Sequence, residues 1–420
     1  MFESLRAEAD IAMTVKHSTF LRVIDVYFFE PKRLLACAFA FLLAYALVIA
    51  IWLSDGFQPV DFTAFWAASW LALNDTPSAI FDHAKVEFAH RIIFPDSSEI
   101  YEWLYPPTFL LFVLPLALLP YTAAYAAWVV SSFTACLWAL SKFATTRWLP
   151  IALLAFPGTL MNVLTGQNGL ILTALFAGAS YALDRSPVLS GVLIGLISMK
   201  PQLGILWLIA LIFGRYWRAL IAAAGTTLAL ALLALISFGW EIWLDFFNRL
   251  LAVQRGLDSG LVSWIKIPTF YGGGRLLGLD ATSAYAGHLV LAFGVTAIVA
   301  AIWSKRSLMV VRSAVLTLAT VLVLPRLLFY DLALLALPLT LLTMDGIRNG
   351  WRPFERPVLL LGWLSPLFGL VSAIAFKLHV TPIIIFAIFL VAARRALAPP
   401  VPVPPARTQV QLGEKCVGQS

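Results

Sequence analysis

Residues 34–53, LLACAFAFLLAYALVIAIWL, form an unbroken apolar run that is long enough to cross a lipid bilayer as an α-helix. Similar runs recur along the rest of the 420-residue chain, in which 61% of the residues are hydrophobic and only 12% are charged. The mean hydropathy is +0.89. This composition excludes a soluble enzyme and predicts an all-α, multi-pass bundle of transmembrane helices.

Charged residues, prolines and glycines divide the rest of the chain into further apolar runs. These runs cover about 104–119, 121–140, 148–165, 168–183, 187–199, 203–214, 219–239, 283–303, 308–324, 330–343, 357–375 and 381–393. The run 104–119 contains Pro106, Pro107 and Pro115, which favours a re-entrant or interfacial segment over a full span. Without that run, we predict about 12 transmembrane helices, or roughly 11 to 13.

These helices are expected to form one membrane domain over residues 34–395. The preceding segment, 1–33, is too long and too acidic for the start of a signal peptide, so we expect the first helix to remain in the protein. The tail 396–420 begins ALAPPVPVPP, which is typical of a disordered, polyproline-like end.

The distribution of basic residues predicts the orientation in the membrane. With an even number of spans, both chain ends lie on one side, and that side receives roughly two-thirds of the 29 Lys and Arg residues. The positive-inside rule makes it cytoplasmic, which leaves the loops at about 54–103 and 240–282 on the outer side. The net charge of +7 therefore requires no nucleic-acid partner, although membrane lipids, especially anionic ones, suit the basic side.

The first outer loop, about 54–103, is acidic and contains the motif DFTAFWAAS, which begins at Asp61. A loop of this length in a tightly connected bundle is usually functional. Phe62, Phe65 and Trp66 follow helical spacing, which predicts an amphipathic helix lying in the membrane interface. A carboxylate beside the lipid boundary is costly, so Asp61 is either a functional group or the N-cap of this helix.

The second outer loop, about 240–282, alternates aromatic and basic residues, including Trp264, Lys266 and Arg275. This pattern suits anchoring among lipid headgroups, and it also suits binding of a lipid-linked phosphate. The glycines 272–274 lack the Lys-Ser/Thr of a Walker motif and do not follow a strand, so they predict no nucleotide loop.

Polar residues also stand at three helix junctions on the predicted outer side. They are Gln167 in TGQNG, Lys200 and Gln202 in SMKPQLG, and Arg326, Tyr330 and Asp331 in PRLLFYD. Lys200 and Arg326 at membrane depth need anionic partners, which a lipid phosphate would provide. The alternative is an internal ion pair, for instance between Arg326 and Asp331.

Cysteine and histidine spacing predicts no disulfide framework and no metal site. Cys37 and Cys136 lie in apolar runs and Cys416 lies in the tail, while the histidines form no HxxH or HExxH motif. We therefore expect no metal and no other cofactor.

Five segments together resemble glycosyltransferase family 87, whose members include polyprenol-phosphate-mannose-dependent mannosyltransferases of the GT-C fold. In chain order they are DFTAFWAASWLALNDTPSAIFD, WLYPPTFLLFVLPLALLPYTAAYAAW, GQNGLILTALFAGA, PVLSGVLIGLISMKPQLG and PRLLFYDLALLALP. The resemblance runs through roughly residues 35–340. It implies a bacterial inner-membrane enzyme that takes a hexose, with mannose as the first candidate, from a polyprenyl-phosphate carrier on the periplasmic side.

The resemblance also implies roles for individual residues. Asp61 matches the acidic residue of the first outer loop, which acts as general base in GT-C enzymes. Direct displacement would invert the anomeric centre while the lipid phosphate leaves. Candidates to bind that phosphate are Lys200, Arg275 and Arg326, and candidates to bind the sugar or the acceptor are Tyr105, Gln167, Gln202, Tyr330 and Asp331. The acceptor would be a glycan, a glycolipid or another hydroxyl compound.

Two other classes of protein share this composition. A transporter or flippase of a lipid-linked saccharide would also carry basic residues at depth, but transporters typically show repeated halves, and the sequence shows none. A scaffold without chemistry would tolerate replacement of Asp61 by Asn.

Overall fold

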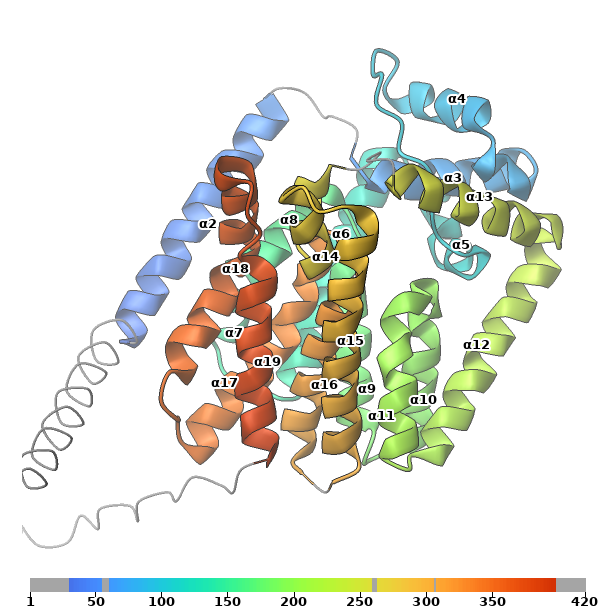
Figure 1. Ribbon diagram of the computed structural model, residues 1–420. Helices are drawn as coiled ribbons and strands as arrows, with labels where there is room; N and C mark the ends of the chain where they lie inside the picture. The colour runs from blue at the N-terminus through green and yellow to red at the C-terminus, as the bar shows by residue number, and fades with distance from the viewer. Residues whose placement is uncertain (1–29, 55–59, 259–262, 306, 398–420) are drawn as a thin grey trace, which may run out of the picture.

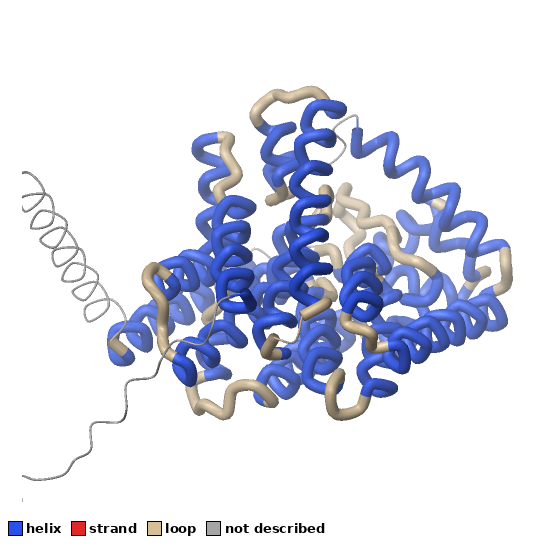
Figure 2. Tube along the Cα trace, turned by 60° about the horizontal axis from the view of Figure 1, so that its bottom comes forward, coloured by secondary structure: helices blue, strands red, loops and turns tan. Residues whose placement is uncertain are grey.

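The computed structural model describes residues 30–54, 60–258, 263–305 and 307–397. These residues form α-helices and short 3-10 helices, and Figure 2 shows no strand among them. Each apolar run that the sequence defined is helical, so the prediction of an all-α protein is confirmed. The N-terminal segment and the Pro-rich tail that the sequence predicted lie almost entirely outside the described residues.

Six helical stretches in the described part of the chain are long and apolar enough to cross a membrane. They are α2 (Pro31–Ser54), α6 (Tyr121–Ser141), α12 (Trp217–Phe238), α15 (Ala281–Trp303), the consecutive η6 (Phe329–Leu335) and α17 (Ala336–Asn349), and α18 (Glu355–Phe376). The other apolar runs form shorter helices, because prolines and glycines interrupt them. Length and composition alone thus identify half of the roughly 12 predicted spans.

The shorter helices fill the bundle between the long ones (Figure 1). They are α7 (Leu149–Leu154), α8 (Pro157–Thr165), α9 (Gly169–Ala182), α10 (Pro187–Leu196) with η3 (Ile197–Met199), η4 (Pro201–Gly204) with α11 (Ile205–Phe213), α16 (Met309–Val323) and α19 (Thr381–Leu397). The core runs along α16, which is buried from Val311 to Leu322 and packs against α15, α17 and α19.

A second group of helices lies at one end of the bundle (Figure 1). It comprises α3 (Phe62–Asn74), η1 (Pro77–Phe81), α4 (His83–Ile93), α13 (Glu241–Asp258), η5 (Trp264–Lys266) and α14 (Phe270–Leu276). These are the two loops that the sequence placed together on the outer side, and Arg249 of α13 forms an ion pair with Glu102 between them. We call this end the Asp61 face.

The aromatic residues of α3 pack inside the protein, whereas the position of the helix relative to the membrane stays a prediction. Phe62, Phe65 and Ser69 are fully buried and Trp66 is 7% exposed, because α3 packs beneath α4 and η1 and against the 107–118 segment. The serine hydroxyl donates to the backbone carbonyls of Phe65 (2.7 Å) and Val113 (2.9 Å). The helix preceded by Asp61 is therefore a fixed internal element.

The proline-rich run 104–119 does not cross the bundle. It forms α5 (Pro107–Val113) and η2 (Leu114–Leu118). Helix α3 packs against both of these elements. Tyr105 lies beside Phe65 of α3 with ring centroids 5.3 Å apart, and the Trp66 indole donates to the carbonyl of Leu119 at 3.0 Å. The segment enters and returns on the Asp61 face, as its prolines predicted.

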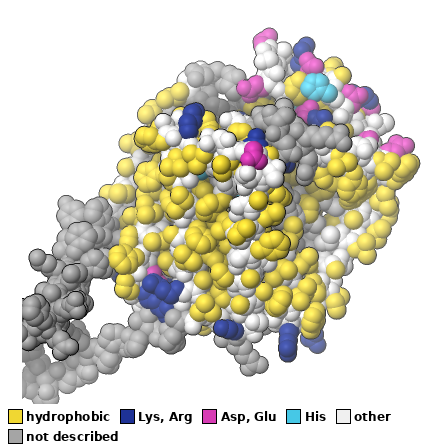
Figure 3. Space-filling view, viewed as in Figure 1, with side chains coloured by type: hydrophobic (Ala, Val, Ile, Leu, Met, Phe, Trp, Pro, Cys, Tyr) yellow, Lys and Arg dark blue, Asp and Glu magenta, His cyan; other side chains and the backbone are white. Residues whose placement is uncertain are grey.

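Charge divides the molecule into two ends separated by an apolar belt (Figure 3). Acidic side chains gather at the Asp61 face, whereas Lys and Arg dominate the exposed charges at the opposite end, which we call the basic face. The belt between them is covered by exposed apolar residues such as Leu43, Ile236 and Phe293. This arrangement suits a protein embedded in a bilayer.

Candidate active site

Asp61 does not cap the helix that it precedes. Its backbone is already helical, its side chain makes no capping hydrogen bond, and the amide of Val60 instead donates to Thr63 Oγ1 at 3.2 Å. The carboxylate turns to a distant part of the chain, where Gln167 Nε2 donates to Asp61 Oδ2 at 3.2 Å. The capping interpretation of Asp61 is therefore wrong.

The loop TGQNG carries Gln167 to this position. It follows α8, which ends at Gly166 in the left-handed conformation, with φ of +63°. A Cβ at Gly166 would lie 2.5 Å from Cβ of Phe62, and one at Gly169 would lie 2.7 Å from the carbonyl oxygen of Tyr330. Only glycine allows so close an approach, so the loop fits between the start of α3 and η6.

Tyr105 fixes the orientation of the Gln167 amide. Its hydroxyl donates to Gln167 Oε1 at 2.7 Å, which leaves the amide nitrogen to face Asp61. Burial raises the pKa of Tyr105 well above its usual value, so the phenol stays protonated and remains a donor. The three side chains form a directed chain of hydrogen bonds that ends on the carboxylate.

Lys200 and Asp331 form a second buried pair beside this chain. Lys200 Nζ lies 2.5 Å from Asp331 Oδ1 and 5.3 Å from the centre of the Tyr330 ring. The amide of Leu328 donates to the other carboxylate oxygen of Asp331 at 3.3 Å. The alternative of an internal ion pair thus holds for Asp331, but its partner is Lys200 from the η3–η4 junction and not Arg326, which the sequence offered as an example. We call Asp61, Tyr105, Gln167, Lys200 and Asp331 the Asp61 cluster.

The electrostatics of the Asp61 cluster favour a basic carboxylate. Burial raises the pKa of Asp61 above its usual value, and the charge of Asp331 adds to this effect. The hydrogen bond from Gln167 and the charges of Lys266 and Lys200 lower that pKa in part. Among the described residues, no cation forms an ion pair with Asp61. The carboxylate thus combines a raised affinity for protons with free acceptor positions.

Aromatic and basic residues of η5, of α14 and of the loop before η6 contact one another. The guanidinium of Arg275 lies 4.7 Å from the Trp264 ring centre, and that of Arg326 lies 5.8 Å from the Tyr271 ring centre. The rings of Trp264 and Tyr271 meet edge to face at 5.8 Å. Lys266, two residues after Trp264, is exposed and close enough to Asp61 to affect its pKa.

The structure thus brings together most of the residues that the sequence selected. Gln202 is exposed in η4, and no described contact joins it to the Asp61 cluster. The described contacts of Arg275 and Arg326 are with Trp264 and Tyr271, which are not members of the cluster. Sequence reasoning placed Lys266 in a loop that suits lipid anchoring or phosphate binding but did not link it to Asp61, and it missed Asn162, whose side chain lies between Gln167 and Gly169. No motif spacing links these two residues to Asp61. In the described ranges, no group of three or more His, Cys, Asp or Glu residues is placed to hold a metal ion.

Comparison with known proteins identifies the family. The sequence pattern of glycosyltransferase family 87 matches residues 103–325, which is more than half of the chain. The matched part contains Tyr105, Gln167, Lys200 and Arg275, whereas Asp61 precedes it. No curated protein and no solved structure matches the chain. With its several candidate membrane spans, the chain is a multi-pass membrane protein that belongs to glycosyltransferase family 87.

Proposed function

We propose that this glycosyltransferase moves a hexose, with mannose as the first candidate, from a polyprenyl-phosphate donor to a hydroxyl of its acceptor at the Asp61 face. One observation carries the proposal. Asp61 is a partly buried carboxylate with a raised pKa, oriented by Gln167, and no cation among the residues that the structure describes forms an ion pair with it. Such a group can remove a proton from a hydroxyl that approaches its free acceptor positions.

The proposed reaction is a single displacement. Asp61 takes the proton of the acceptor hydroxyl as that oxygen forms a bond to the anomeric carbon. The bond from this carbon to the phosphate oxygen breaks on the opposite side of the sugar, so the configuration inverts. Tyr105 and Gln167 hold the base in place, and they are also candidates, with Tyr330, to contact hydroxyls of the sugar or of the acceptor.

The leaving phosphate gains negative charge in the transition state and needs fixed positive charge nearby. Arg275 and Arg326 lie over Trp264 and Tyr271, and Lys266, two residues after Trp264, is close enough to Asp61 to affect its pKa. Lys200 already has Asp331 as its partner, so we assign it a supporting charge rather than direct contact. Lys266, Arg275 and Arg326 are therefore the proposed phosphate ligands.

We further propose a GT-C-type arrangement of about 12 crossings, in which the shorter apolar helices cross together with the six long ones. The chain would then start and end at the basic face, which we assign to the cytoplasm of a bacterial inner membrane. The acidic Asp61 face would lie in the periplasm. The separation of charges in Figure 3 supports this orientation.

The experiment that tests the proposal measures sugar transfer in membranes that contain the chain, with radiolabelled polyprenyl-phosphate-mannose as donor. The native chain is compared with Asp61→Asn at matched expression, and Asp96→Asn serves as a control because it changes an exposed acid of the same outer loop. We expect the native chain and the control to transfer mannose and Asp61→Asn to lose at least about 100-fold in rate. Equal rates for the native chain and Asp61→Asn would refute the role of the base.

A further inference from the structure

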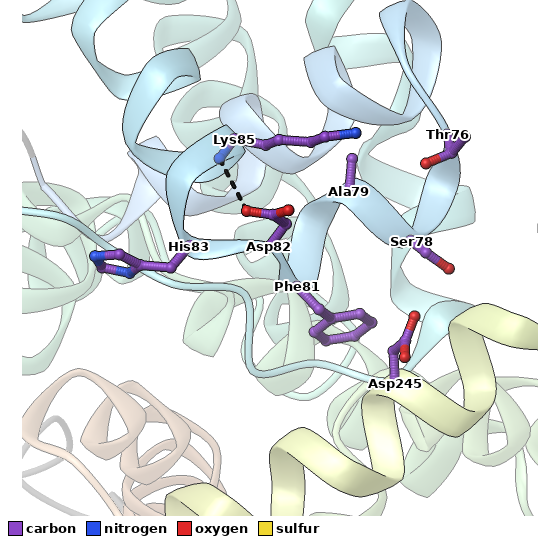
Figure 4. A pocket seen from close by; sticks show the side chains of 8 residues that line it. All are labelled: Thr76, Ser78, Ala79, Phe81, Asp82, His83, Lys85 and Asp245. Carbon is purple, nitrogen blue, oxygen red and sulfur yellow. Dashed lines mark hydrogen bonds between the residues drawn. The ribbon is translucent and has the colours of Figure 1, made fainter.

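A cavity of about 410 Å³ lies between the two outer loops, away from the Asp61 cluster. Its lining combines hydroxyl, carboxylate, ammonium and imidazole groups with one aromatic ring: Thr76, Ser78, Ala79, Phe81, Asp82, His83, Lys85 and Asp245. The volume falls within the range of small-molecule sites. The first seven residues come from η1 and α4, and Asp245 comes from α13 across the cavity (Figure 4).

Some of these polar groups already serve the fold. Asp82 caps α4 by accepting from the amides of Ala84 and Lys85, and His83 points away from the cavity toward Glu102, which is 3.2 Å distant. Lys85 pairs with Asp75 at 2.8 Å. Ser78 and Asp245 differ from them, because no hydrogen bond of either side chain is present among the described residues. Figure 4 shows both beside the Phe81 ring.

A second, smaller cavity lies beside the first one. It has about 110 Å³ and is lined by Phe81, Trp103, Leu104, Phe246, Arg249 and Leu250. Phe81 therefore lines both cavities. The ring of Trp103 lies 5.4 Å from that of Tyr105, whose hydroxyl holds Gln167 against Asp61. The path from the first cavity to the base therefore passes the second cavity and these packed rings.

The length of this path restricts the ligand. Thr76 and Asp61 lie at opposite ends of α3, whose 13 residues correspond to about 20 Å. One sugar cannot reach across that distance, whereas a chain of several sugars can. The free hydroxyl and carboxylate suit sugar hydroxyls, and the aromatic ring suits the apolar face of a sugar ring. Asp82 and Asp245 disfavour an acidic ligand.

We infer that the cavity between η1, α4 and α13 is an acceptor subsite, and that the acceptor is a neutral oligosaccharide chain. Its inner sugars bind near Ser78, Phe81 and Asp245, while its terminal hydroxyl reaches Asp61. The inference rests on the proposed function, since it supplies the acceptor for that reaction. It adds a length requirement that the Asp61 cluster alone does not impose.

The test measures binding without turnover, so that it does not depend on catalysis. The full-length Asp61→Asn protein, purified in detergent, is titrated with linear manno-, gluco- and galacto-oligosaccharides of one to six sugars, and with oligogalacturonates as acidic probes. Asp245→Asn and Ser78→Ala are added to this background, with Glu241→Gln as matched control. Glu241 lies on the same helix, one turn earlier, and does not line the cavity.

We expect at least one neutral series to bind with an affinity that rises with chain length. Asp245→Asn should weaken the longest member about tenfold and Ser78→Ala less, while Glu241→Gln has no effect. The inference is overturned if no neutral series binds, if affinity ignores length, if acidic chains bind equally well, or if Glu241→Gln matches Asp245→Asn. Failure of the proposed function would appear separately, as absence of mannose transfer by the native chain.

Discussion

Asp61 at one end of the bundle and Glu355 at the other are both carboxylates held inside the protein, but their partners differ. At the Asp61 face, Asp61 receives one hydrogen bond from an uncharged amide and has no ion-pair partner among the described residues. At the basic face, Glu355 is fully buried and receives bonds from Arg394 (3.0 Å), from Arg395 and from the amide of Arg352 (2.8 Å). Among the described residues, Asp61 thus keeps acceptor positions without a hydrogen bond, whereas the acceptor positions of Glu355 are filled.

The ion pairs around Glu355 join α17, α18 and α19. Arg395 of α19 also pairs with Asp345 of α17 and donates to the carbonyl of Gly350 at 2.9 Å. We call Arg395, Arg394, Glu355 and Asp345 the Arg395 cluster. The comparison teaches that burial of a carboxylate does not by itself indicate catalysis. A catalytic carboxylate needs spare acceptor positions and an environment that raises its pKa, whereas a structural one has its positions filled.

The largest expected effect concerns the Arg395 cluster. Arg395→Met should lower the free energy of unfolding by about 3–5 kcal/mol, because it leaves Asp345 and Glu355 buried without their main cation. Thermal unfolding of the detergent-purified protein measures this loss. Arg348→Met, which removes an exposed arginine of the same end of α17, should cost less than about 1 kcal/mol. Equal stability of the two variants would show that the Arg395 cluster does not hold the helices together.

The next prediction tests whether Lys266 at the Asp61 face binds the donor phosphate. Lys266→Met should raise the KM for the polyprenyl-phosphate donor about tenfold, because it removes a charged hydrogen-bond donor from the proposed phosphate ligands. Kinetics over a range of donor concentrations separate KM from kcat. Lys377→Met, an exposed lysine of the same face, is the control. An unchanged donor KM in Lys266→Met would place the phosphate elsewhere.

A smaller effect is expected from the hydrogen bond to the base. Gln167→Leu should lower kcat by about fivefold, because the hydrogen bond from this amide to the carboxylate contributes about 1 kcal/mol. Gln202→Leu, which alters the exposed glutamine that only the sequence selected, should stay within about twofold of the native rate. The same assay measures both variants. A stronger effect at Gln202 than at Gln167 would contradict the arrangement of the site.

The smallest effect is a shift of the pH profile. Asp61 acts as a base only when ionised, so kcat should fall as the pH decreases through its raised pKa. The charge of Lys266 lowers that pKa, so Lys266→Met should move the acid limb to higher pH. Rates measured at saturating donor from acid to neutral pH test this direction. An acid limb that moves to lower pH would mean that another group titrates.

The sequence predicted the helices well because apolar runs and prolines are local signals. The return of 104–119 to one face, for example, follows from its prolines. The burial of the α3 aromatic residues inside the protein was not predicted, since aromatic residues that suit a membrane interface equally suit a buried contact, and periodicity cannot distinguish the two. How many of the shorter helices cross depends on a bilayer and not on helix length alone.

The sequence predicted which residues belong to the candidate site better than it predicted which of them contact each other. Polar residues at helix junctions stood out against an apolar chain, and the structure gathers most of them around Asp61. Which cation meets which carboxylate was not predictable, because Lys200 and Asp331 are 131 positions apart and Arg326 is nearer in sequence. Lys266 lies in a loop whose composition equally suits lipid anchoring, so only the fold brings it near the base.

The most direct measurement determines mannose transfer and thermal unfolding on the same preparations of the native chain, Asp61→Asn and Glu355→Gln. We predict that Asp61→Asn loses at least about 100-fold in transfer rate and keeps the unfolding temperature of the native chain. Glu355→Gln should unfold at a lower temperature and retain transfer while folded. An active Asp61→Asn protein, or one that loses activity only because it unfolds, would contradict the assignment of Asp61 as the catalytic base.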